Sequence, residues 1–318
     1  NTFPRRVDRM TIMKSILLAL HLVLVNLAAI GPLFCIGLIW RDAPDLQQTG
    51  KWLAKWSCAG LLIGMLFGGL IMGMYSFGGA ALNGTRFYNA LLQIPHDRLW
   101  WGVAELAFYF LCMLPAVFFW PALMRRRWLL TVLLFLAATN LLYHFTPLFV
   151  VVGYLQGGTD FTPLTKPELR SLTISPPVLA RVVHHLLAGV AIVATVLLLR
   201  TASQAQSSRT PASKKAFETL VRRYGIWIFL VTLLEIPSGI WFLLQLPNAV
   251  QNQFIGGNVF VTSWFAAALL LVMLLLYKSF AVLTGETARR DAWQIATLLL
   301  TVILMMTGLL AFILPRYT

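Results

Sequence analysis

Seven ionisable side chains interrupt the long apolar runs of this sequence and are its best candidates for chemistry. They are His21, Glu105, His144, Arg181, His184, His185 and Glu235. An ionisable group is costly to place in hydrocarbon, so one found inside an apolar run is a functional candidate by default. Neutral imidazole is a common axial ligand of haem iron, and a carboxyl group in such a setting can carry a proton. The residue types therefore point to haem ligation by histidines and to proton transfer by Glu105 and Glu235.

The composition shows what surrounds these side chains. Of 318 residues, 59% are apolar and 11% are charged, which is roughly half the usual charged share. A soluble domain of this size needs a larger charged shell. The net charge of +14 comes from short basic clusters between apolar runs, a pattern typical of membrane topology signals, so we exclude nucleic-acid binding. The three cysteines have no paired spacing, so they support neither a disulfide framework nor a zinc site.

Eight apolar segments are long enough to span a bilayer, which takes roughly 20 residues as a helix. They are 13–40, 53–75, 99–123, 128–154, 176–199, 224–246, 259–277 and 293–314. The sequence therefore predicts an all-α polytopic membrane protein. We expect a five-helix haem-binding part at 1–200, an inner linker at 201–223 that is rich in Ser, Thr, Ala and Lys, and a three-helix part at 224–318.

The distribution of Lys and Arg sets the expected orientation. The connections after the first, third, fifth and seventh segments carry most of these residues, whereas the other side has fewer, Arg98 among them as a loop charge. The positive-inside rule then places both termini on the outer side.

Helical geometry brings the candidates to similar depths. At 1.5 Å per residue from the outer end, His21 and His184 lie roughly 12 Å deep, His144 about 15 Å, Glu105 about 9 Å and Glu235 about 16 Å. Histidines on separate helices at one depth are what axial haem coordination requires. Structural hydrogen bonding between helices remains the alternative for each of them.

Two methionines, together with Arg181 and His185 from the candidates above, extend this picture. Met305 and Met306, roughly 12 Å deep, are weak candidates for thioether ligation of iron. Arg181 lies one turn outward of His184, where its guanidinium can pair with a haem propionate or simply extend to the interface. His185 points about 100° away from His184, so only one of the two can ligate a given iron.

Two sequence elements carry a family resemblance. His21 lies early in the first segment, within ALHLVLV at 19–25, and His184 ends the stretch PVLARVVH at 177–184. Over residues 1–200 the chain resembles the large subunit of cytochrome bd-type quinol oxidases. The resemblance implies that His21 ligates a high-spin haem, that His184 binds a low-spin haem b, and that the membrane is the bacterial cytoplasmic membrane.

The departures from that family are as informative. The third segment has only Glu105 where the family carries two carboxylates, and 246–258 is short and uncharged where the family has a long quinol-binding loop. The Gly-Arg-Gln-Pro-Trp motif is absent, and an Ala-rich stretch at 265–268 replaces an expected Met. His144, which the family pattern does not provide, can pair with His21 to make a six-coordinate haem.

We therefore expect a b-type haem subunit of a respiratory complex. It would transfer electrons between the quinone pool and an outer-face partner such as a periplasmic c-type cytochrome, together with other membrane subunits. One alternative is a reduced bd-like quinol oxidase. The second is a haem-free subunit with a structural role or a role in proton-coupled transport.

Overall fold

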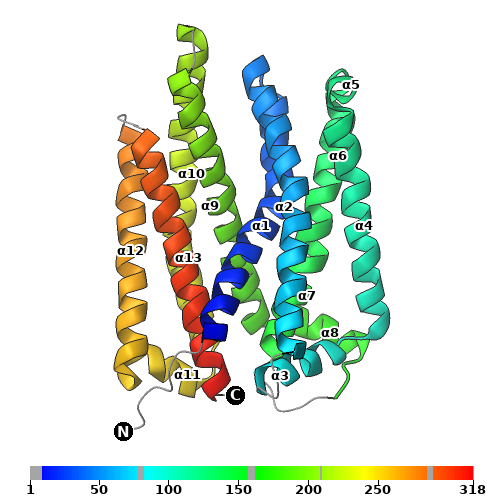
Figure 1. Cartoon of the computed structure of the whole chain (residues 1–318), viewed down its shortest axis with the longest axis vertical. Coiled ribbons are helices and arrows are strands. Elements are labelled where there is room, and N and C mark those ends of the chain that lie inside the picture. Colours follow the sequence, from blue (N-terminus) through cyan, green and yellow to red (C-terminus); the bar gives the residue numbers. More distant parts are fainter. Residues whose placement is uncertain (1–8, 78–81, 157–161, 208–209, 285–288, 318) are drawn as a thin grey trace.

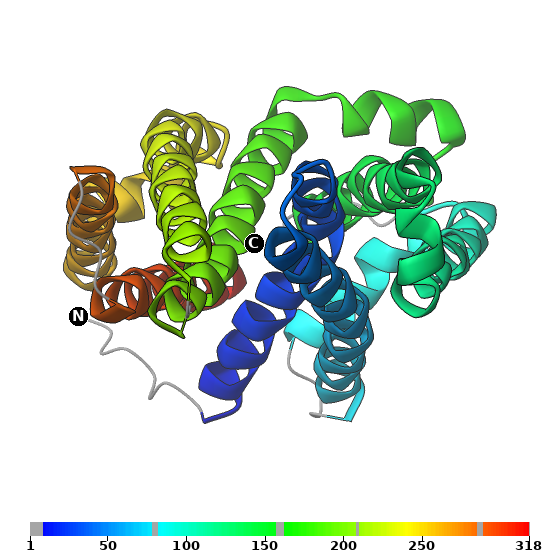
Figure 2. The same ribbon diagram turned by 90° about the horizontal axis from the view of Figure 1, so that it is seen from above.

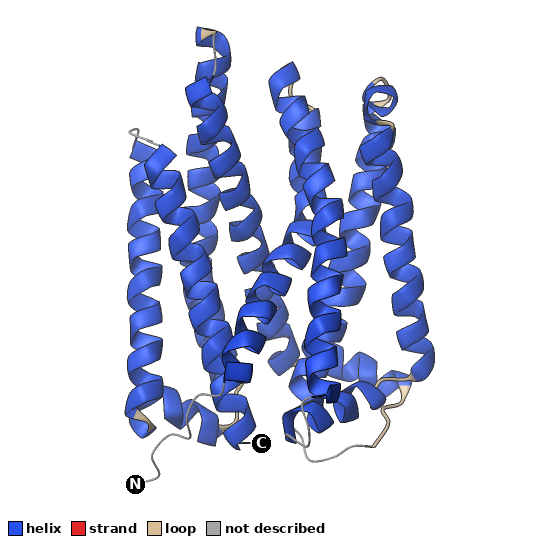
Figure 3. Cartoon of the chain, in the orientation of Figure 1, coloured by secondary structure: helices blue, strands red, loops and turns tan. Residues whose placement is uncertain are grey.

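The structure is a computed structural model that describes residues 9–77, 82–156, 162–207, 210–284 and 289–317. Every regular element in these ranges is a helix, and eight of the helices are long and apolar enough to cross a membrane. Figure 3 shows the long helices running side by side. The predicted fold class, an all-α polytopic membrane protein, is confirmed.

The eight spans correspond one to one with the predicted segments. They are α1 (Arg9–Ile39), α2 (Pro44–Phe77), α4 (His96–Phe118), α6 (Arg127–Asn140) continued by the π-helix η1 (Leu141–Phe145) and α7 (Thr146–Leu155), α9 (Pro176–Ser207), α10 (Pro211–Leu244), α12 (Val259–Thr284) and α13 (Arg289–Tyr317). Short elements connect them: α3 (Leu82–Leu92), α5 (Trp120–Met124), α8 (Lys166–Thr173), α11 (Asn248–Asn252) and the π-helix η2 (Gln253–Gly257).

The helices extend beyond the apolar segments at several ends. Residues 201–223, predicted as a linker, are helical through Ser207 and again from Pro211. The side chain of Thr210 accepts a hydrogen bond from the backbone N–H of Ser213, and Pro211 occupies the first turn. This N-cap and the proline are a strong start signal, so α10 begins well before its apolar part.

Figure 1 shows the arrangement of the spans. The end at which α1 begins and α13 ends also carries α3, α8 and α11, whereas α5, the end of α9 and the start of α10 lie at the opposite end. Seen from above in Figure 2, α10, α12 and α13 gather on one side and α2, α4 and α6 on the other. Because α1 packs against α2, α6, α9 and α13, it joins the two groups.

The buried core follows the same helices. The cluster of buried apolar side chains runs through α1, α2, α4, α6, α9 and α10 without a break. Tyr109 is fully buried on α4, and its hydroxyl donates a hydrogen bond to the carbonyl of Ala28 on α1 at 3.1 Å. This hydrogen bond gives a partner to the hydroxyl, the one polar side-chain atom of Tyr109, and holds α4 against α1. Large apolar side chains also cover the exterior, for example Leu111 and Leu270, as expected for a surface that faces lipid.

Candidate functional site

The first candidate, His21, is held on α1 by a close approach to α2. Its Nδ1 atom lies 2.7 Å from the carbonyl oxygen of Gly64. Since a carbonyl can only accept, Nδ1 carries the proton and Nε2 keeps a free lone pair. Gly60, Gly64 and Gly68 are spaced four residues apart on α2 and let its backbone approach α1. A Cβ at Gly68 would lie 3.3 Å from Nδ1 of His21, so this glycine makes room for the imidazole.

A substitution at Gly68 tests this packing. An added Cβ would lie 3.1 Å from Cε1 of His21, whereas a Cβ at the neighbouring Gly69 would meet nothing within 4 Å. Replacing Gly by Ala in a helix interior stabilises the folded state by about 1 kcal/mol. We expect Gly69→Ala to be more stable by this amount. We expect Gly68→Ala to be destabilised by about 1–3 kcal/mol, because the added methyl group overpacks the contact with His21. Thermal unfolding in detergent compares the two variants directly, and equal melting temperatures would contradict the proposed contact.

The second candidate, His184 on α9, faces α10. Its Nδ1 lies 2.5 Å from Oε2 of Glu235 and 3.1 Å from the hydroxyl of Ser238. The Ser238 hydroxyl donates to the backbone carbonyl of Glu235, which ties the group together. Gly239 places the α10 backbone beside the ring, because a Cβ there would lie 3.4 Å from Cε1 of His184. With Glu235 accepting at Nδ1, Nε2 of His184 is again the free nitrogen.

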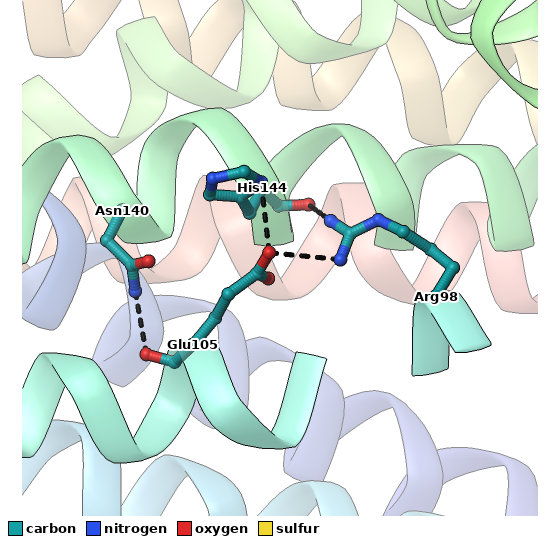
Figure 4. Close-up of polar contacts among 4 residues, drawn as sticks. All are labelled: Arg98, Glu105, Asn140 and His144. Carbon is teal, nitrogen blue, oxygen red and sulfur yellow. Dashed lines mark hydrogen bonds and ion pairs between the residues drawn. The ribbon is translucent and has the colours of Figure 1, made fainter. Parts of the chain in front are cut away.

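The third candidate, His144, belongs to a polar cluster between α4 and η1, drawn in Figure 4. One carboxylate oxygen of Glu105, Oε1, lies 3.0 Å from Nη1 of Arg98 and 3.0 Å from Nδ1 of His144. Asn140 donates its amide to the Glu105 backbone carbonyl at 2.7 Å, and Arg98 also reaches the His144 carbonyl at 3.4 Å. In Figure 4 the second ring nitrogen of His144 points away from Glu105.

The π-helical turn explains how His144 reaches this position. Pro147 has no N–H and its ring would clash with the carbonyl of Tyr143 one turn earlier. The backbone widens instead, and Thr146 donates to the carbonyl of Leu141, five residues back. Single π-helical turns of this kind occur frequently at functional sites.

Arg181 lies on α9, and no carboxylate among the described residues pairs with it. Its guanidinium carbon is 5.5 Å from the centroid of the Tyr154 ring and 5.1 Å from that of Phe242. Its Nε atom is buried and has no hydrogen-bond partner among the described residues. A buried cation with a free donor calls for an anionic partner that the described part of the chain does not supply.

The remaining candidates are less closely engaged. His185 is half-buried and interacts electrostatically with both His184 and His21, so these three imidazoles belong to one neighbourhood. Met305 and Met306 are half-buried on α13, which packs against α1 and α9. The backbone carbonyl of Met305 accepts a hydrogen bond from Trp264 at 3.0 Å.

Three supporting residues were not singled out from the sequence as site residues, and spacing could have found them. Arg98 is not a loop charge but part of α4, seven residues before Glu105 and so on the same face. Ser238 is three residues after Glu235, and Gly64 belongs to the four-residue glycine spacing on α2. The contact of Asn140 could not be predicted from spacing, because its side chain bonds to the backbone of another helix.

No group of three or more His, Cys, Asp and Glu side chains in the described ranges is arranged to hold a metal ion. The chain matches no protein-family model, and no curated protein matches it significantly.

Proposed function

We propose that this chain is a b-type haem subunit of a bacterial respiratory complex, which transfers electrons between the quinone pool and an outer-face partner such as a periplasmic c-type cytochrome. The supporting observation is the same for all three histidines. His21, His144 and His184 each bond through Nδ1 to a carbonyl or carboxylate oxygen. A ligating histidine usually has such a partner, because it fixes the ring and leaves Nε2 free to bind the metal.

The imidazole nitrogens of these histidines suit a haem better than a bare metal ion. Porphyrin supplies four of the iron ligands, so one or two imidazoles complete the coordination, whereas a bare ion needs more side chains. His21 on α1 and His184 on α9 would hold the haem iron, since these helices pack together. Arg181, one turn from His184 and without a carboxylate partner among the described residues, would bind a propionate.

A bound haem supplies a one-electron redox centre. The residues of this chain then orient the imidazoles and set their donor strength. Glu235 accepts the Nδ1 proton of His184 and makes Nε2 a stronger electron donor, while the neutral carbonyl of Gly64 does so less for His21. The two imidazoles therefore differ in the charge of their Nδ1 partners. The Lys and Arg distribution supports placing the end with α3, α8 and α11 on the outer side of the membrane.

The test is a dithionite-reduced minus oxidised visible spectrum of the gently purified native complex, recorded with and without carbon monoxide. Sharp b-type bands that carbon monoxide leaves unchanged are the expected result, because both axial positions are filled. Bands that shift with carbon monoxide would favour the reduced bd-like quinol oxidase. A preparation that is intact but contains no pigment would contradict the proposal.

A second function, proton-coupled transport, has one specific observation in its favour. Both membrane carboxylates are paired with histidines. Oε2 of Glu105 and Oε1 of Glu235 are buried and have no hydrogen-bond partner within the described ranges. Such groups can take up and release protons. This function predicts a pigment-free protein whose solute flux stops when the proton gradient is dissipated.

A further inference from the structure

The cluster of Arg98, Glu105 and His144 differs from the surroundings of Arg181 in its charge balance. Arg98 and Glu105 form an ion pair at 3.0 Å, and the same carboxylate oxygen holds Nδ1 of His144. Counted with a neutral imidazole, the three side chains carry no net charge. The cluster therefore suits a neutral polar ligand, whereas the unbalanced Arg181 suits an anion.

This cluster is accessible from the lipid-facing surface. The side chain of His144 is 37% exposed, and the exposed fractions of Trp101 and Tyr143 are 64% and 76%. Trp101 lies one helical turn before Glu105, and the ring of Tyr143 contacts the ring of His144 with centroids 4.8 Å apart. A ligand that arrives through the bilayer thus meets aromatic rings and a polar cluster at one place.

The free nitrogen of His144, Nε2, determines which hydrogen bond a ligand can form with this cluster. Glu105 holds the Nδ1 proton, so Nε2 is an acceptor, and it points away from the carboxylate in Figure 4. Arg98 is engaged by Glu105 and by the His144 carbonyl. The fitting partner is a neutral, lipid-soluble, flat molecule with a hydroxyl group to donate.

We propose that this cluster is the binding site for the headgroup of a membrane quinol, with its hydroxyl donating to Nε2 of His144. This binding site adds the location of quinol binding to the function proposed above. It rests on that function, because the electrons of the quinol need a haem as acceptor. It gives His144 a role in substrate binding and not in iron ligation. The site lies between α4 and η1, and η1 contacts α1, which carries His21.

The reaction at this site balances as two one-electron steps. A bound haem would accept one electron in each step. The hydroxyl that donates to Nε2 of His144 would give its proton to that nitrogen, and the opposite hydroxyl would lose its proton to water. The imidazolium is stabilised by the carboxylate of Glu105 and then releases its proton to water at the outer side. The outer-face partner reoxidises the haem between the two steps. One quinol thereby yields one quinone, two electrons and two protons.

Photolabelling tests the binding site without reference to haem. The quinol form of an azido derivative of a short-chain ubiquinone, kept reduced without oxygen, is added to the native complex in nanodiscs, and labelled peptides are mapped. We expect labelling on α4 and η1 that falls about tenfold or more in His144→Asn, the loss of one hydrogen bond to the ligand. Asparagine keeps a donor at the position of Nδ1 for Glu105 and removes the acceptor at the position of Nε2. His96, an exposed histidine at the start of α4, provides the matched control. The variant His96→Asn should be labelled to the same extent as the wild type.

Reduction kinetics separate this proposal from the proposed function. Duroquinol should reduce the wild-type pigment quickly and that of His144→Asn at least about tenfold more slowly, while dithionite gives both the same spectrum. A variant that loses its dithionite spectrum would make His144 an axial ligand and overturn the site. Unchanged labelling and unchanged duroquinol reduction would overturn it as well. A wild-type complex without pigment would instead contradict the proposed function, and labelling alone would then decide the binding site.

Discussion

The His184→Ala variant is expected to lose the b-type absorbance of its haem, whereas Glu235→Gln is expected to keep the absorbance and raise the reduction potential. Alanine removes the only ligating atom on this side of the iron. Glutamine still fills the space beside Nδ1, but a neutral amide accepts the proton less strongly than the carboxylate, which lies 2.5 Å away. The ferric state then loses stabilisation relative to the ferrous state.

The size of this shift follows from the effect of outer hydrogen-bond partners on ligand strength. Replacing such a partner changes metal affinity about 10–100-fold. If that change falls mainly on the ferric state, the potential rises by about 60–120 mV, at about 59 mV per tenfold for one electron. Redox titration of the purified complex measures the change. Ser238→Ala, which removes the weaker contact at 3.1 Å, should shift the potential in the same direction by less.

His185→Ala is the matched control for the ligand assignment. His185 is next to His184 on α9 but turned about 100° around the helix. We expect this variant to retain the spectrum. A spectrum that survives His184→Ala and disappears in His185→Ala would exchange the roles of the two residues.

The membrane spans could be predicted because the bilayer leaves few alternatives. A backbone in hydrocarbon must satisfy its own hydrogen bonds, so each apolar run of sufficient length becomes a helix. The ends were less predictable, because helix propensity and caps act there without a hydrophobic signal. α10 begins at Pro211, well before the apolar residues, and α4 ends at Phe118 although the apolar run continues. Pro121 explains the second case, since a proline favours a new helix start.

The side chains of the candidate site were predictable from their types, but their pairings were not. An ionisable residue in an apolar run is visible in the sequence, as with Glu105 and His144. Their contact at 3.0 Å depends on how α4 and η1 are rotated and on the π-helical turn, which the sequence does not specify. Their estimated depths, about 9 and 15 Å, lie in the same half of the membrane but differ by about one helical turn, so they do not predict this contact. The long side chain of Glu105 and the widened turn at His144 bridge that difference.

The ion pair between Arg98 and Glu105 is expected to have the largest effect on stability. Removing one partner of a fully buried pair leaves a charge without compensation and costs about 3–5 kcal/mol. The side chains of Arg98 and Glu105 are 23% and 11% exposed, and His144 remains beside the carboxylate. We therefore expect Arg98→Leu or Glu105→Leu to lower the free energy of unfolding by about 2–3 kcal/mol, measured by reversible unfolding in mixed detergent micelles.

The double variant separates the pair from its individual members. With both charges gone, no uncompensated ion is left in the bilayer, so Arg98→Leu with Glu105→Leu should cost less than the two single changes together, by about 1–2 kcal/mol or more. Asp42 and Arg127 provide the matched control, because they also lie 3.0 Å apart but the Asp42 side chain is 89% exposed. Water and salt screen that pair, so its coupling should stay below about 1 kcal/mol. Additive effects at Arg98 and Glu105 would mean that the carboxylate is neutral in the folded protein. Glu105 would then be free to exchange protons, and His144 would lack the negative partner that the quinol site requires.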